Sequence, residues 1–160
     1  MINYIQRVLC LLLVVFATFE ISAQTKIFKE AAAIDGVTSV YISPSLLNLG
    51  ADVGTLGYGL DEAVDELKGL EVITSTYSLV DRKSVREACN KVIDSLGTEL
   101  LIDINEDGEI VRLFAELEKG TEFAKQMVLE IDETQGNYTV IYIRGKINMT
   151  KIIKDNLRFK

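Results

Sequence analysis

The residues Asp103–Ile110 have the spacing of the first part of a calcium-binding loop. Asp103, Asn105 and Asp107 place oxygen ligands at its positions 1, 3 and 5, with a glycine at 6 and an aliphatic residue at 8. Position 12, where a glutamate normally completes the calcium shell, is Phe114. The flanking apolar residues alternate as in strands, and Asp-Gly is a preferred hairpin dipeptide. The sequence therefore predicts a β-hairpin, with weak calcium binding at Asp103, Asn105 and Asp107 as the alternative.

Histidine is absent from the chain, which removes the commonest general base and the commonest transition-metal ligand. Cys10 lies in an N-terminal apolar segment, so Cys89 is the only other cysteine, and the usual zinc ligand sets cannot form. We expect Cys89 to be a buried, inert thiol on the apolar face of a helix. A hydrolase that uses carboxylate pairs remains the enzymatic alternative. No catalytic residue and no cofactor are predicted.

Four carboxylates follow one another closely in the segment 60–67, which has the apolar spacing of a short helix. They are Asp61, Glu62, Asp65 and Glu66. They would lie opposite the apolar face of that helix and close to its N-terminus, where acidic side chains favour the helix dipole. We therefore expect a solvated helix face rather than a catalytic pair.

Three basic residues crowd the start of a second predicted helix. Arg82, Lys83 and Arg86 stand at the end of the helix where the dipole disfavours cations, and Arg82 and Arg86 are like charges at i, i+4. Either Asp81, Glu87 and hydration offset them, or an anionic ligand or acidic partner binds there. Arg82 and Arg86 are accordingly candidate contact residues. Tyr58, the aromatic residue in a glycine-rich stretch, is another, with a packing role as its alternative.

The charge of the chain is unevenly distributed, although the total is −7. Segment 144–160 holds six basic residues and one acidic residue, whereas segment 24–143 holds 10 basic and 22 acidic residues. Lys151, Lys154 and Arg158 are candidate contacts to an anionic membrane surface or an acidic partner, or they complement the dipole of a last helix. The acidic total argues against nucleic acid as a partner.

Apolar periodicity and turn residues predict the elements that carry these side chains. The expected helices are 24–34, 60–67, 81–96 and one around 149–157; the expected strands are 37–43, 70–77, 99–104, 109–116, 123–132 and 138–144; a glycine-rich loop spans 50–59. This order predicts an α+β fold. It consists of β-α-β-α followed by a four-stranded antiparallel meander and a C-terminal helix, with the helices packed on one sheet face.

The N-terminus has the pattern of a signal peptide. Arg7 precedes an apolar run of about a dozen residues, which is too short for a spanning helix, and small residues at 22–23 suit cleavage. We therefore expect residues 1–23 to be a signal peptide and residues 24–160 to form a single α+β domain. The protein would be exported to the periplasm or the extracellular space after cleavage near Ala23. Cys10 comes too early to be a lipid-attachment residue.

Several short segments together resemble a bacterial family called domain of unknown function 4252. They are Gly36–Ser43 (GVTSVYIS), the glycine-interrupted loop, the strand Leu70–Ser75, the two-strand unit around Asn105–Gly108, and Met127–Asp132 followed by Val140–Gly145. The resemblance implies a small exported envelope protein without an established activity, in a family often encoded beside sigma-factor and anti-sigma regulators. It implies no functional residues.

These observations favour an exported small envelope protein that acts as a non-enzymatic binding or interaction module. Its partner would be a protein or a small molecule of the cell envelope, with peripheral contact to an anionic membrane surface as an addition. The alternatives are a carboxylate-based hydrolase and a weak calcium-binding module at the Asp103–Gly108 turn.

Overall fold

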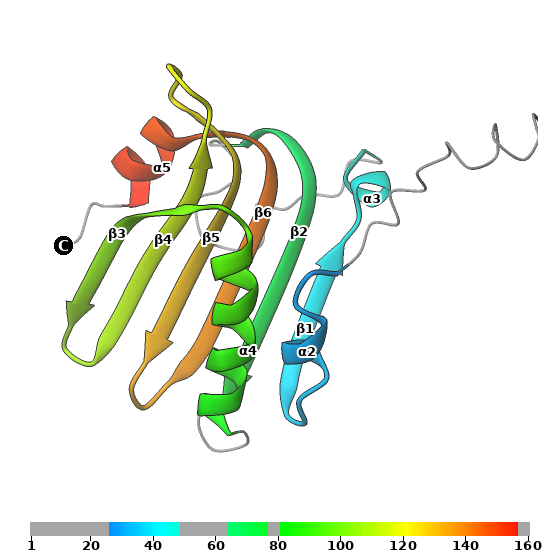
Figure 1. The fold of residues 1–160 in the computed structure, drawn as a ribbon, viewed down its shortest axis with the longest axis vertical. Helices are drawn as coiled ribbons and strands as arrows, with labels where there is room; N and C mark the ends of the chain where they lie inside the picture. Colours follow the sequence, from blue (N-terminus) through cyan, green and yellow to red (C-terminus); the bar gives the residue numbers. More distant parts are fainter. Residues whose placement is uncertain (1–25, 49–63, 77–80, 157–160) are drawn as a thin grey trace, which may run out of the picture.

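The computed structural model describes residues 26–48, 64–76 and 81–156, with only the backbone described at 48, 64–65 and 154–156. Its centre is a six-stranded antiparallel sheet in the order β1-β2-β6-β5-β4-β3 (Figure 1). The strands are β1 (Val37–Ile42), β2 (Val64–Thr76), β3 (Glu99–Glu106), β4 (Glu109–Leu117), β5 (Phe123–Glu133) and β6 (Asn137–Asn148). The helices are α2 (Lys29–Ala32), α3 (Pro44–Asn48), α4 (Arg82–Ser95) and α5 (Met149–Asn156). The α+β class is therefore confirmed.

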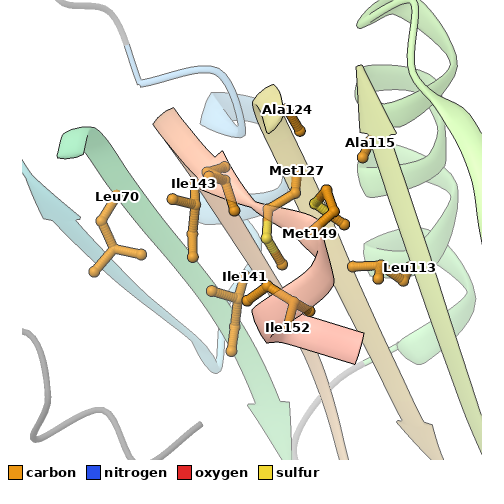
Figure 2. Close-up of a cluster of buried hydrophobic side chains, with 10 residues drawn as sticks. Leu70, Leu113, Ala115, Ala124, Met127, Ile141, Ile143, Met149 and Ile152 are labelled. Carbon is orange, nitrogen blue, oxygen red and sulfur yellow. The ribbon is translucent and has the colours of Figure 1, made fainter. Parts of the chain in front are cut away.

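Helices cover both faces of the sheet. On the α4 face, side chains of the sheet such as Val128 and Tyr142 pack with α2 and α4. On the α5 face, Met127, Ile141 and Ile143 pack with Met149 and Ile152 of α5 (Figure 2). The prediction that all helices share one face is wrong. The central strand β6 carries consecutive apolar residues, which point to alternate faces, so both faces need a cover.

The predicted helix 60–67 is also wrong where the structure describes it, because β2 already begins at Val64. The local apolar spacing is overridden by pairing with β6, which extends along β2 from Val64 to Thr76. Gly145 of β6 permits a close approach here, since a Cβ atom on it would lie 1.9 Å from the carbonyl oxygen of Glu66. The four clustered carboxylates therefore do not share a helix. Asp61 and Glu62 lie outside the described residues.

The strands β3 to β6 pair in sequence order, as part of the larger sheet that β1 and β2 complete. Tight turns join β3 to β4 and β5 to β6, and both lie at the same end of the sheet (Figure 1). The backbone N–H and the hydroxyl of Thr134 both donate to the carbonyl oxygen of Gly108, at 2.7 and 2.6 Å. The two turns are thus tied together.

Helix α4 begins and ends at residues that the sequence makes recognisable. The carboxylate of Asp81 accepts hydrogen bonds from the backbone N–H of Lys83 at 3.1 Å and from the hydroxyl of Ser84 at 2.6 Å. Gly97 follows the helix with a φ of 67°, which suits glycine. Val85, Cys89 and Ile93 form its buried stripe. The helix thus has one fixed face toward the sheet and a fixed N-terminus.

The predicted N-terminal helix 24–34 is reduced, in its described part, to the single turn α2. The buried carboxylate of Glu71 accepts the backbone N–H of Ile27 at 2.9 Å and of Phe28 at 3.2 Å. These two bonds hold the segment before α2 against the sheet. Burial raises the pKa of Glu71, although the two hydrogen bonds partly oppose that shift.

Candidate functional site

A groove of about 690 Å³ lies between the first half of α4 and the turn-bearing end of β4 and β5. Its lining residues are Arg82, Lys83, Arg86, Glu87, Asn90, Ile110, Asp132 and Thr134. Three basic side chains and an amide of α4 thus face a carboxylate, a hydroxyl and an aliphatic wall from the sheet. Two of the contact residues predicted from the sequence, Arg82 and Arg86, meet here.

Asp132 of β5 binds both arginines. Arg82 donates through Nη2 to one carboxylate oxygen of Asp132, and Arg86 donates through Nη2 to the other. Arg82 also donates to the carbonyl oxygens of Glu133 at 2.7 Å and Thr134 at 3.2 Å. The side chain of Asp132 is 7% exposed and that of Arg82 is 14% exposed, whereas Arg86 is 44% exposed. Arg82 is therefore locked to the sheet, while Arg86 still faces the groove.

Asp132 explains why two arginines can occupy the N-terminal half of a helix. A carboxylate buried between two guanidinium groups stabilises both charges, and each arginine in turn satisfies the buried carboxylate. From the sequence alone, Asp81 and Glu87 are the expected partners of these arginines. Asp81 caps the helix instead, and Glu87 makes only an exposed i, i+4 pair with Lys83 at 3.8 Å. The decisive partner is distant in sequence.

A second series of polar side-chain contacts lies beneath α4, next to the groove. The hydroxyl of Tyr138 donates to the buried carboxylate of Glu130 at 3.0 Å, and Arg112 donates to the other oxygen at 3.3 Å. Arg86 lies over the ring of Tyr138, 6.0 Å from its centroid. Both carboxylate oxygens of Glu130 thus have a hydrogen-bond donor, and this series of contacts joins α4, β4, β5 and β6.

Cys89 is enclosed by the same packing. It is fully buried, and burial raises the pKa of its thiol to about 12 despite a hydrogen bond with Tyr138. A thiol whose pKa lies this far above neutral pH does not form the reactive thiolate. The geometry agrees with the expected inert role of this cysteine.

The calcium-loop residues occupy a β-hairpin. Asp103 and Asn105 lie on β3, opposite Arg112 and Ile110 of β4, and Asp103 forms an ion pair with Arg112 at 3.4 Å. Asp107 and Gly108 form the turn, with φ angles of 48° and 84°. Across residues 26–48, 64–76 and 81–156, no group of three potential ligands stands ready to hold a metal ion. Calcium binding there stays a prediction without geometric support.

A second concave region, of about 610 Å³, lies between the two tied turns. It is lined by Asp107, Gly108, Glu109, Glu133, Thr134, Gln135 and Gly136. Glu109 and Glu133 are cross-strand neighbours, and Glu133 accepts the backbone N–H of Asn137 at 3.0 Å. Three carboxylates therefore line this region, but they are exposed at turns and strand ends rather than enclosed in a water-excluding pocket.

Of the remaining contact candidates, only Lys151 has a described side chain, and it does not line the groove. Tyr58 and Arg158 lie outside the described residues, and Lys154 is described only as part of the α5 backbone. Lys151 is exposed on α5. Among the basic residues of β6, Arg144 and Lys146 alternate with Ile143 and Ile147, so they point to the α4 face instead. A single basic C-terminal surface is not formed by the described side chains.

Comparison with known proteins gives one result. The model of the family described as Domain of unknown function (DUF4252) matches residues 29–154. The chain belongs to this family. The match to DUF4252 runs from the start of α2 into α5, so it includes the groove and the whole sheet. No curated protein and no solved structure matches the chain.

Membership of DUF4252 confirms the resemblance drawn from the short segments, and it assigns no activity. In the described part of the chain, no helix has the length and apolar character needed to cross a membrane. The groove residues Asn90 and Ile110 were not singled out as a site from the sequence, and Asp132 was missed as the partner of Arg82 and Arg86. Only the crowding of basic residues at 82–86 pointed to this place.

Proposed function

We propose that this DUF4252 protein is an exported, non-enzymatic interaction module of the cell envelope that binds acidic groups of a partner in the α4 groove. The observation that carries the proposal is the charge of the groove. Its lining has three basic side chains against two carboxylates, in a chain whose net charge is −7. A locally positive concavity on an acidic protein favours an anionic ligand group.

The arrangement also supports recognition of a specific shape. Arg82 is fixed by three acceptors on the β5 end, and the same carboxylate orients Arg86. A guanidinium held in one orientation can bind a partner carboxylate with two parallel hydrogen bonds. Asn90 adds an amide and Ile110 an apolar surface beside it. These features suit an acidic side chain or a chain terminus better than a featureless anionic surface.

Binding of a fluorescent oligoglutamate peptide, followed by anisotropy, tests the groove. The double variant Lys83→Gln/Arg86→Gln should weaken binding by about tenfold or more, because it removes the two basic side chains that are exposed to the groove. Lys91→Gln is the matched control. Lys91 lies on the same helix, is exposed, and pairs with Glu30 at 2.9 Å outside the groove.

Equal loss of binding in the Lys91 variant would reduce the effect to general charge and would contradict the groove as the site. Affinity that falls with added salt in the wild type, but hardly changes in the double variant, would support it. Melting temperatures of all variants show whether the fold is retained.

Export is tested separately by the intact mass of protein recovered from the envelope and the cytosol of its host. A mass that begins at Gln24, found outside the cytosol, supports the signal peptide. A polypeptide that retains Met1 and stays in the cytosol contradicts it.

A further inference from the structure

The sheet has two edges, formed by β1 and β3, and no described element pairs with the outer side of either strand (Figure 1). Such an edge offers a row of backbone N–H and C=O groups to any other extended chain. The two edges differ in the side chains and backbone irregularities that natural proteins use to prevent such pairing.

The β3 edge is protected in two ways. It carries the acidic residues Glu99, Asp103 and Glu106, and its register with β4 shifts between Leu100 and Ile102. Two copies of β3 placed side by side would bring carboxylates together, and the bulge would interrupt the ladder. Pairing between β3 strands is therefore disfavoured.

The β1 edge has neither protection. Its sequence, VTSVYI, contains no charged residue and no proline, and its register with β2 is continuous from Val37 to Ile42. Val40 is 42% exposed, although it heads a cross-strand apolar row that continues through Val72 to Ile141. Among the described residues, this edge therefore ends an apolar row at an exposed valine.

We propose that β1 pairs in antiparallel fashion with β1 of a second copy of this chain, joining the two sheets into one. A two-fold axis places the same surface of each copy together, so an uncharged strand meets an uncharged strand. In the register that centres on Val40, this valine lies beside its own copy, and Thr38 lies beside Ile42. The apolar row is then continuous across the interface, and no carboxylate of β1 opposes another.

A second copy fits this edge better than a β1-to-β3 contact between copies. That contact would set the neutral strand against Glu99, Asp103 and Glu106, and as a head-to-tail contact it would form a larger ring or an open filament. The two-fold pairing closes with two molecules. It is independent of the proposed ligand groove, which lies on α4.

Light scattering after size-exclusion chromatography tests the pairing, using the protein as its host exports it, from about 1 μM to about 1 mM. The dimer fraction of the wild type should rise with concentration. It should also rise with salt, which screens the repulsion between two acidic molecules. Salt has the opposite effect on binding of oligoglutamate in the groove, so the failure of one proposal is distinguishable from the failure of the other.

Val40→Lys should shift the protein to monomer by placing like charges beside each other at the centre of the pairing. Leu100→Lys is the matched control, because Leu100 is 49% exposed on the opposite edge strand. Ile104→Lys on β3 is a second control, because Ile104 lies two residues from Ile102 of the α5-side cluster and so adds a lysine to the α5 face at the edge opposite β1. Both controls should remain dimeric, with melting curves confirming that all three variants fold.

A wild type that stays monomeric over the whole concentration range overturns the proposal. So does dissociation caused by Leu100→Lys or Ile104→Lys to the same extent as by Val40→Lys.

Discussion

Arg82 in the first turn of α4 binds Asp132 on β5, 50 residues further along the chain. The same guanidinium reaches two backbone carbonyls where β5 ends. Through this contact the start of the helix is fixed to the turn-bearing end of the sheet. The groove lies at that junction, between the fixed helix start and the ends of β4 and β5.

Asp132→Asn should lower the free energy of unfolding by about 3 kcal/mol, since it leaves two arginines beside a group that no longer carries the opposing charge. Urea denaturation measures the change. Asp103→Asn is the control, because Asp103 is half exposed in its pair with Arg112 and should cost less than about 1 kcal/mol. Equal costs for the two variants would show that burial of Asp132 is not what makes its pairs important.

Cys89 should resist thiol reagents in the folded protein at about pH 8, because burial raises the pKa of its thiol to about 12. Labelling followed by peptide mapping measures its modification apart from that of any other cysteine. In denaturant the residue should react at the rate of an ordinary thiol. Rapid labelling under native conditions, with the melting temperature unchanged, would contradict the packing around Tyr138.

Glu71 should make stability depend on pH in a direction set by its raised pKa. Folded Glu71 takes up a proton at a higher pH than the unfolded chain, whose ordinary value is 4.5. Its contribution to the free energy of unfolding is therefore present at low pH and is lost as pH rises from 4.5 through the folded pKa. Urea titrations of the wild type and Glu71→Gln should show the wild type gaining relative to the variant from about pH 7.5 to about pH 5.

The difference in stability between the wild type and Glu71→Gln cancels the contributions of other titrating groups. One of them is Asp81, whose pKa is lowered by its hydrogen bond to Ser84 in both proteins. A difference between wild type and variant that grew with rising pH would reverse the sign and reject the interpretation.

Calcium should leave the melting temperature unchanged, because Asp103 is engaged by Arg112 and pairs with it across β3 and β4. The measurement compares about 1 mM calcium with an excess of chelator. A rise that saturates with calcium, and that Asp107→Asn abolishes, would instead restore the calcium-loop hypothesis.

Gly108→Ala should destabilise the protein by about 1 kcal/mol or more, since Gly108 has a φ of 84° that alanine adopts poorly. Its new Cβ atom would also lie 3.1 Å from the hydroxyl oxygen of Thr134, which ties the two turns. Thermal unfolding measures the loss. Gly97→Ala, at a φ of 67° but with open space around it, separates the backbone cost from the steric one.

The parts of the fold that local patterns determine were predictable from the sequence. Strand alternation located β4 and β5 to within a residue or so, and apolar spacing with Asp81 and Gly97 located α4. The first half of β2 was not predictable in this way, because its pairing with β6 is a long-range contact that overrides a local helical pattern. The same holds for the placement of α5 on the opposite face.

The candidate site was predictable only in part for the same reason. The basic residues at 82–86 were visible as an electrostatic anomaly, which pointed to Arg82 and Arg86. Their partner Asp132 alternates with apolar residues of β5, as an exposed residue of a half-buried strand also does. Only the placement of α4 over that side of the sheet turns Asp132 into a buried anchor.

The hydrogen bonds from the backbone of Ile27 and Phe28 to Glu71 limit how far the protein can be shortened from its N-terminus. A protease that removed the chain through Phe28 would take away both donors and strand a carboxylate in the apolar interior. Trimming that stops before Ile27 leaves the carboxylate its two partners. For this contact, Ile27 is therefore the first residue that the folded body requires.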